Sequence, residues 1–98
     1  MKLTINSSDN LEISTEDTVL TVYKSSMKNL SEKLKVIANK DIISCKMEVD
    51  DFYSLYKYES VIKTAPMVIE ICDLEDDEFL TISDIEAKMI IKFIGQQS

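Results

Sequence analysis

The sequence contains no histidine and no arginine, and it has a single glycine and a single proline. Without histidine, the chain lacks the side chain that most often serves as a general base or metal ligand near neutral pH. Neither GxxxxGK[ST] nor GxGxxG occurs, so the glycine-rich loops that hold nucleotide phosphates are excluded. Because arginine is missing and the net charge is −7, we expect no direct binding of nucleic acid. We therefore expect a protein that is not an enzyme and that holds no cofactor or metal ion.

Cysteine and long apolar runs are scarce as well. The two cysteines, Cys45 and Cys72, form no CxxC pair, and we interpret them either as small hydrophobic residues in neighbouring strands or as a redox-sensitive pair. No apolar run approaches the roughly 18 residues that a membrane span needs, and the first residues lack the apolar core of a signal peptide. We expect one cytoplasmic, intracellular domain that does not enter a membrane.

The charges that are present are unevenly distributed. Residues 24–46 carry six lysines against two acidic residues, a local charge of +4, whereas the remainder carries five lysines against sixteen acidic residues, or −11. The lysine-rich segment either steers a charged partner or forms the solvated face of an amphipathic helix. The acidic run 73–78 is either a solvated turn or a cation site, although it lacks the spacing and the glycine of an EF-hand loop.

Apolar periodicity predicts an alternation of strands and helices. Residues 3–5 and 11–13 flank a turn-prone segment, which indicates a β-hairpin or a strand followed by an irregular connection. In chain order, the further expected elements are a central strand at 19–23, a helix from Ser25 or Ser26 to Ala38, a strand at 42–49, a helix at 52–62, antiparallel strands at 67–72 and 79–82, and a helix that begins at Ser83 and ends at Gly95.

Helical spacing also predicts which side chains face the core. In the helix at 52–62 the buried positions would be Phe52, Leu55, Tyr58 and Ile62, with Tyr53 and Tyr56 either exposed at an interface or partly buried. In the last helix the apolar stripe would be Ile85, Met89, Ile90 and Phe93, and Ser83 with Glu86 predicts a capping box.

Three segments of the sequence resemble the thioredoxin and glutaredoxin family. Residues 19–26 look like the first core strand running into the active-site loop, 47–51 resemble the second strand, and 58–69 resemble the segment leading into the strand that a cis-proline opens. The resemblance implies one thioredoxin-like α/β domain over residues 1–98. Its core at 18–94 would have a central mixed four-stranded sheet flanked by three helices, and residues 1–17 would add an N-terminal strand or hairpin.

The turn at 24–31, where this family carries its two redox cysteines, contains none. Because a thiolate is the nucleophile in disulfide exchange, the resemblance implies a redox-inactive domain. We interpret the chain as a protein-binding or structural module with a protein partner. The expected contact surface joins the loop to the cis-proline strand and comprises Ser25, Ser26, Met27, Lys28, Ala65 and Pro66.

Two other functions remain open from the sequence. The charge of −11 outside residues 24–46, in a small chain without catalytic residues, suits an acidic phage or viral inhibitor that mimics nucleic acid. Cys45 or Cys72 could alternatively serve a degenerate thiol oxidoreductase.

Overall fold

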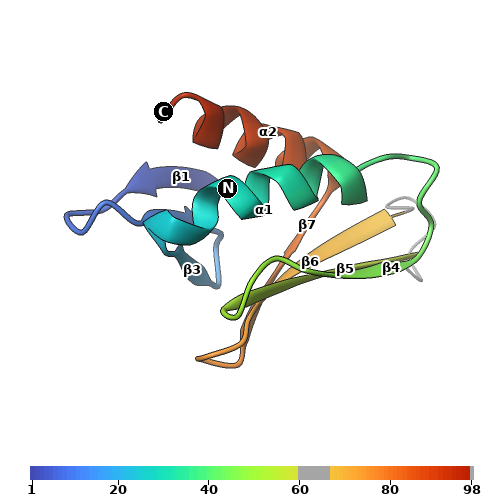
Figure 1. The fold of residues 1–98 in the computed structure, drawn as a ribbon, viewed down its shortest axis with the longest axis horizontal. Helices are drawn as coiled ribbons and strands as arrows, with labels where there is room; N and C mark the ends of the chain where they lie inside the picture. Colours follow the sequence, from blue (N-terminus) through green and yellow to red (C-terminus); the bar gives the residue numbers. More distant parts are fainter. Residues whose placement is uncertain (60–66, 98) are drawn as a thin grey trace.

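The computed structural model describes residues 1–59 and 67–97. Within these ranges the elements are β1 (Lys2–Ile5), β2 (Leu11–Ser14), β3 (Val19–Val22), α1 (Lys24–Ile37), β4 (Cys45–Glu48), β5 (Tyr53–Glu59), β6 (Met67–Asp73), β7 (Glu78–Ile82) and α2 (Asp84–Gly95). The strands form two antiparallel sheets, ordered β1-β2-β3 and β4-β5-β6-β7. Both helices lie on one face of the four-stranded sheet, and the three-stranded sheet lies beside the start of α1 (Figure 1).

Aliphatic side chains from both sheets and both helices fill a single core. The residues with no exposed surface include Leu11, Ile13, Leu20, Val22, Leu30, Leu34, Ile37, Leu55, Ile69, Ile71 and Ile90. In the strands these residues alternate with exposed or half-buried ones, because successive side chains of a strand point to opposite faces. The hairpin β1–β2 contributes to this core, so it is an integral part of the packed structure.

This architecture corrects the expected thioredoxin-like fold. A central mixed sheet between three helices needs parallel strand pairs, whereas every strand pair in the described residues is antiparallel. The expected central strand at 19–23 is β3, which lies at an edge of the three-stranded sheet. The hairpin at residues 1–17 is confirmed, but it pairs with β3 rather than extending the four-stranded sheet.

The largest local correction concerns residues 52–62, which were expected to form a helix. From Tyr53 to Glu59, the last residue described there, the segment forms β5, whose inward side chains Tyr53, Leu55 and Lys57 are all buried. Tyrosine-rich segments favour strands, and these three positions have the spacing of two that a strand requires. Because the third inward residue, Lys57, is charged, the sequence does not show a regular alternation of apolar and polar residues here.

The burial of individual side chains changes with this correction. Phe52 and Tyr58, expected in the core, are 37% and 40% exposed, whereas Tyr53 is 1% exposed. The expected burial of Ile62 and the expected cis peptide bond at Pro66 fall on residues 60–66, which lie outside the described residues.

The two helices begin in different ways. The capping box of α2 is confirmed, because Ser83 Oγ accepts the Glu86 N–H at 3.2 Å and Glu86 Oε1 accepts the Ser83 N–H at 3.1 Å. The expected serine cap of α1 was wrong: its N-cap is Tyr23, whose side chain makes no capping hydrogen bond. Instead Asn10, in the β1–β2 loop, accepts the Lys24 N–H on its Oδ1 at 3.0 Å. The hairpin thereby satisfies one of the free N–H groups of the first helical turn.

The buried face of α2 also differs from the predicted stripe. Ile90 is buried as expected, but Ile85 and Met89 are 73% and 47% exposed, and Ala87 and Ile94 take the inward positions. The expected C-cap, Gly95, is the last helical residue, and Gln96 is the cap.

A buried tyrosine joins β5 to the edge of β3. The Tyr53 hydroxyl donates to the Thr21 carbonyl at 2.7 Å and accepts the Tyr23 N–H at 3.0 Å. Both backbone groups point away from β2, so they would otherwise lack a partner at this edge. Burial of the phenol, the largest cause, raises the Tyr53 pKa to about 12.

A buried lysine joins β5 to both helices. Lys57 Nζ donates to the carbonyls of Ile37 at 2.8 Å and Asn39 at 3.0 Å, at the C-terminal end of α1. It also lies 3.7 Å from Asp84 Oδ1, at the start of α2. The last carbonyls of a helix have no partner within the helix and carry partial negative charge, which suits an ammonium group.

Candidate functional site

The residues predicted to contact a partner belong to helix rather than loop. Ser25, Ser26, Met27 and Lys28 form part of the first turns of α1, while Ala65 and Pro66 lie outside the described residues. Ser26 is fully buried, and its hydroxyl has no hydrogen-bond partner in the described part of the chain. Met27 and Lys28 line a pocket, whereas Ser25 is exposed beside it.

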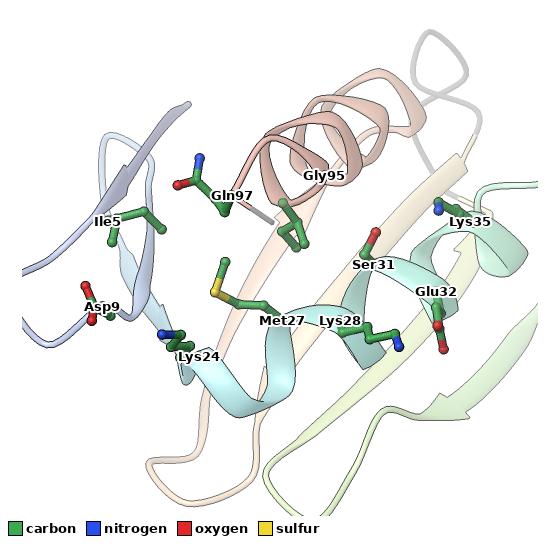
Figure 2. Close-up of a pocket in the computed structure, with 11 residues that line it drawn as sticks. Ile5, Asp9, Lys24, Met27, Lys28, Ser31, Glu32, Lys35, Gly95 and Gln97 are labelled. Atoms are coloured by element: carbon green, nitrogen blue, oxygen red, sulfur yellow. The ribbon is translucent and has the colours of Figure 1, made fainter.

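This pocket, of about 520 Å³, lies where the β1–β2 hairpin, α1 and the C-terminal end of α2 meet. Met27 from α1 lies between Ile5 of β1 and the end of α2, which contributes Ile94 (Figure 2). The three side chains form the apolar floor. The volume is within the range of roughly 300–1,000 Å³ that is typical of ligand pockets.

A row of lysines borders the floor on the side of α1. Lys24, Lys28 and Lys35 line the pocket together with Ser31, at helical spacings of four, three and four residues. Residues at such spacings share one face of a helix, so the row follows directly from the sequence of α1. We name these three lysines, with the floor of Ile5, Met27 and Ile94, the lysine pocket.

The charged groups of the lysine pocket are free to meet a ligand. The only ion pair within residues 1–59 and 67–97 joins Lys57 to Asp84, so Lys24, Lys28 and Lys35 have no carboxylate partner there. Asp9 and Glu32 also line the pocket, which leaves its border with one net positive charge in a chain of net charge −7. Cationic groups and apolar surface therefore come together in this pocket.

The position of the hairpin is fixed by its own turn. Asn6 Oδ1 accepts the backbone N–H groups of Ser8 at 2.9 Å and Asn10 at 3.0 Å, while Asp9 has a φ of 64°. Asparagine and aspartate stabilise such turns because their side chains hydrogen-bond to nearby backbone and they tolerate left-handed conformations. This turn carries Asp9 to the border of the pocket and Asn10 to the start of α1.

The acidic run after β6 forms a structured turn. Asp73 Oδ1 accepts the backbone N–H groups of Glu75 at 3.0 Å and Asp76 at 3.3 Å, and Asp77 has a φ of 52°. Among the residues that the structure describes, no group of three acidic, cysteine or histidine side chains is placed to hold a metal ion. Glu75 raises the pKa of the neighbouring Tyr23 through a hydrogen bond and its charge.

The two cysteines point away from each other. Cys45 lies opposite Lys57 in the sheet and shares its inner face, whereas Cys72 lies opposite Ser54 and Phe79 on the outer face. They belong to β4 and β6, with β5 between them, rather than to neighbouring strands. Both are free thiols, and burial, followed by the charge of Glu70, raises the pKa of Cys72. A thiol with a raised pKa is a poorer nucleophile at neutral pH.

Of the residues that the sequence predicted to contact a partner, Met27 and Lys28 line the lysine pocket, and its other residues were not predicted. The spacing of Lys24, Lys28 and Lys35 was a readable signal for one basic helix face. Nothing local in the sequence connects Ile5 with Ile94, which come from opposite ends of the chain.

Comparisons of the chain with protein-family models, with curated proteins and with solved structures found no match. No helix in the described ranges has the length and apolar character needed to cross a membrane.

Proposed function

We propose that this domain is a protein-binding module, and that the lysine pocket takes an acidic segment of the partner. One observation carries this proposal: three lysines that have no ion-pair partner among the described residues border an apolar floor in a chain that is otherwise acidic. A ligand that suits both features has carboxylates next to an aliphatic or aromatic side chain.

The two parts of the lysine pocket would contribute differently to binding. Full burial of one aliphatic side chain against Met27 and its neighbours contributes about 1.5–3 kcal/mol. Each exposed lysine–carboxylate pair adds only about 0.2–1 kcal/mol, and salt weakens it. The lysines would chiefly speed the encounter and orient the partner, because complementary charge acts on association rate and specificity more than on affinity.

A short labelled peptide of alternating glutamate and leucine tests the proposal by fluorescence anisotropy. We expect binding that weakens as salt is added, and a peptide of alternating lysine and leucine should not bind. The variant Lys28→Glu/Lys35→Glu should bind the acidic peptide at least about tenfold more weakly, which corresponds to roughly 1.4 kcal/mol.

The matched control is Lys33→Glu/Lys40→Glu, which changes the net charge equally at exposed lysines outside the pocket. It should bind within about twofold of the wild type, since salt largely screens the effect of surface charges outside the pocket. A Met27→Ala variant, checked for folding by thermal unfolding, should also lose affinity. Equal losses in both charge variants, or no binding of the acidic peptide to the wild type, would refute the proposal.

A further inference from the structure

The four edge strands of the two sheets are protected unequally. Edge strands expose unpaired backbone groups, and proteins commonly guard them with lysine, proline or a bulge. β1 contains Lys2, β4 contains Lys46, and the Tyr53 hydroxyl satisfies the Thr21 carbonyl and the Tyr23 N–H at the edge of β3. β7, with the sequence Glu-Phe-Leu-Thr-Ile, has no lysine and no proline, and its one charged residue, Glu78, lies at the start of the strand.

The register shows which backbone groups of β7 are open. The Leu74 N–H donates to the Phe52 carbonyl, so the even-numbered residues of β5 form their backbone hydrogen bonds with β6. Ser54 therefore forms its backbone hydrogen bonds with Cys72. In an antiparallel sheet, neighbouring residues of a strand form their backbone hydrogen bonds on opposite sides. Cys72 bonds with β5, so the neighbouring residue, Ile71, bonds with Leu80 of β7. Phe79 and Thr81 therefore direct their N–H and C=O groups away from β6, and neither has a backbone partner among the described residues.

A groove of about 590 Å³ runs beside this open edge. Its walls are residues 78–81 of β7 on one side and the start of β3 on the other. Apolar surface is available in it, because Phe79 is 56% exposed and Val19 is 52% exposed. The groove is bordered by the carboxylates of Asp17, Asp77 and Glu78 and by no basic residue.

We propose that β7 accepts an extended segment of a partner protein as an added strand, and that this segment alternates basic and apolar residues. The open N–H and C=O groups of Phe79 and Thr81 supply the main-chain pairing on which strand addition depends. Because side chains of a strand alternate between its two faces, such a segment places apolar groups on one face and cationic groups on the other. Its charge complements the three carboxylates of the groove.

A second copy of this chain fits this edge poorly. Pairing of β7 with β7 across a two-fold axis would gather four carboxylates, Asp77 and Glu78 of each copy, in one interface, and the groove offers no basic residue to offset their repulsion. This surface is separate from the lysine pocket, which selects the opposite charge, so the failure of either proposal leaves the other standing.

The test uses a labelled peptide of alternating lysine and valine, about eight residues long, and measures its binding to the full chain by fluorescence anisotropy. A second peptide has the same sequence but carries N-methyl groups on alternate residues, which removes the N–H donors of one edge. We expect the first peptide to bind and the methylated peptide to bind at least tenfold more weakly. Equal affinity of the two peptides, or no binding of the first at about 1 mM, overturns the proposal.

Two protein variants locate the site. Asp17→Lys/Glu78→Lys should weaken binding at least tenfold, whereas Asp41→Lys/Glu48→Lys, which changes the charge equally at exposed residues outside the groove, should not. Thr81→Pro removes one outward N–H without removing a β6–β7 hydrogen bond, and it should weaken binding similarly. If the groove variant and its control lose affinity equally, or if a folded Thr81→Pro protein binds like the wild type, the proposal is wrong.

Discussion

Tyr53 and Lys57 stand four residues apart on the inner face of β5, and both serve the backbone of another element. Tyr53 satisfies one carbonyl and one N–H at the edge of β3, while Lys57 satisfies two carbonyls at the end of α1. Both side chains are buried, and both cross a boundary between layers. They differ in what they can offer: a hydroxyl donates and accepts, whereas an ammonium group only donates.

The hydrogen-bonding groups of each side chain match the backbone groups that it contacts. The edge of a strand presents donors and acceptors alternately, so a hydroxyl can satisfy both kinds of group. The end of a helix presents only carbonyls, which an ammonium group satisfies, and the carboxylate of Asp84 adds a counter-charge. In this fold, buried polar residues therefore stabilise the junctions between elements, while aliphatic residues fill the space between them.

The largest expected effect follows from Lys57→Met. The substitution keeps the apolar stem but leaves two carbonyls and the Asp84 carboxylate without their cation, so we expect a loss of about 3–5 kcal/mol in the free energy of unfolding. Urea unfolding followed by circular dichroism would measure it. Lys33→Met, at an exposed position of α1, should change stability by less than about 0.5 kcal/mol. Similar losses in the free energy of unfolding for the two variants would show that the contacts of Lys57 with α1 and α2 do not stabilise the fold.

A smaller loss is expected from Tyr53→Phe. The ring still fills its site, but the Thr21 carbonyl and the Tyr23 N–H lose their partner, which should lower the free energy of unfolding by about 1–3 kcal/mol. Tyr56→Phe is the control, because Tyr56 is only half-buried on the outer face of the sheet. If Tyr53→Phe is as stable as the wild type, the two hydrogen bonds between the Tyr53 hydroxyl and β3 contribute nothing to stability.

The third effect concerns pH: it is absent near neutral pH and appears only in alkaline solution. Burial raises the pKa of Tyr53 from 10.0 to about 12, so the stabilisation of its neutral form is complete below pH 10 and is lost as pH rises toward 12. We expect the wild type to lose stability in that window more steeply than Tyr53→Phe. Other tyrosines, such as Tyr58 beside Glu70, titrate in both proteins, so the difference between the two curves isolates Tyr53. If the stability of the two proteins falls in parallel between pH 10 and 12, the Tyr53 hydroxyl does not contribute to stability as proposed.

Several elements could be predicted from the sequence because their signals are local. The hairpin β1–β2, the helix α1, the pair β6–β7 and the capping box of α2 each depend on turn residues, periodicity or caps within a few positions. The lysine face of α1 belongs to the same class. By contrast, the expected thioredoxin-like fold depended on a helix at 52–62, and it is wrong because residues 53–59 of that segment form the strand β5.

The sequence by itself determined where the chain turns, where its two helices lie and where cationic charge gathers. Only the tertiary structure decided that β5 is a strand, that two antiparallel sheets replace one mixed sheet, and that Ile5 and Ile94 meet at Met27. The physical reason is the environment of Lys57. Burial of a lysine is costly in isolation, and it becomes favourable only when carbonyls at the end of α1 and a carboxylate of α2 converge on it from distant parts of the chain.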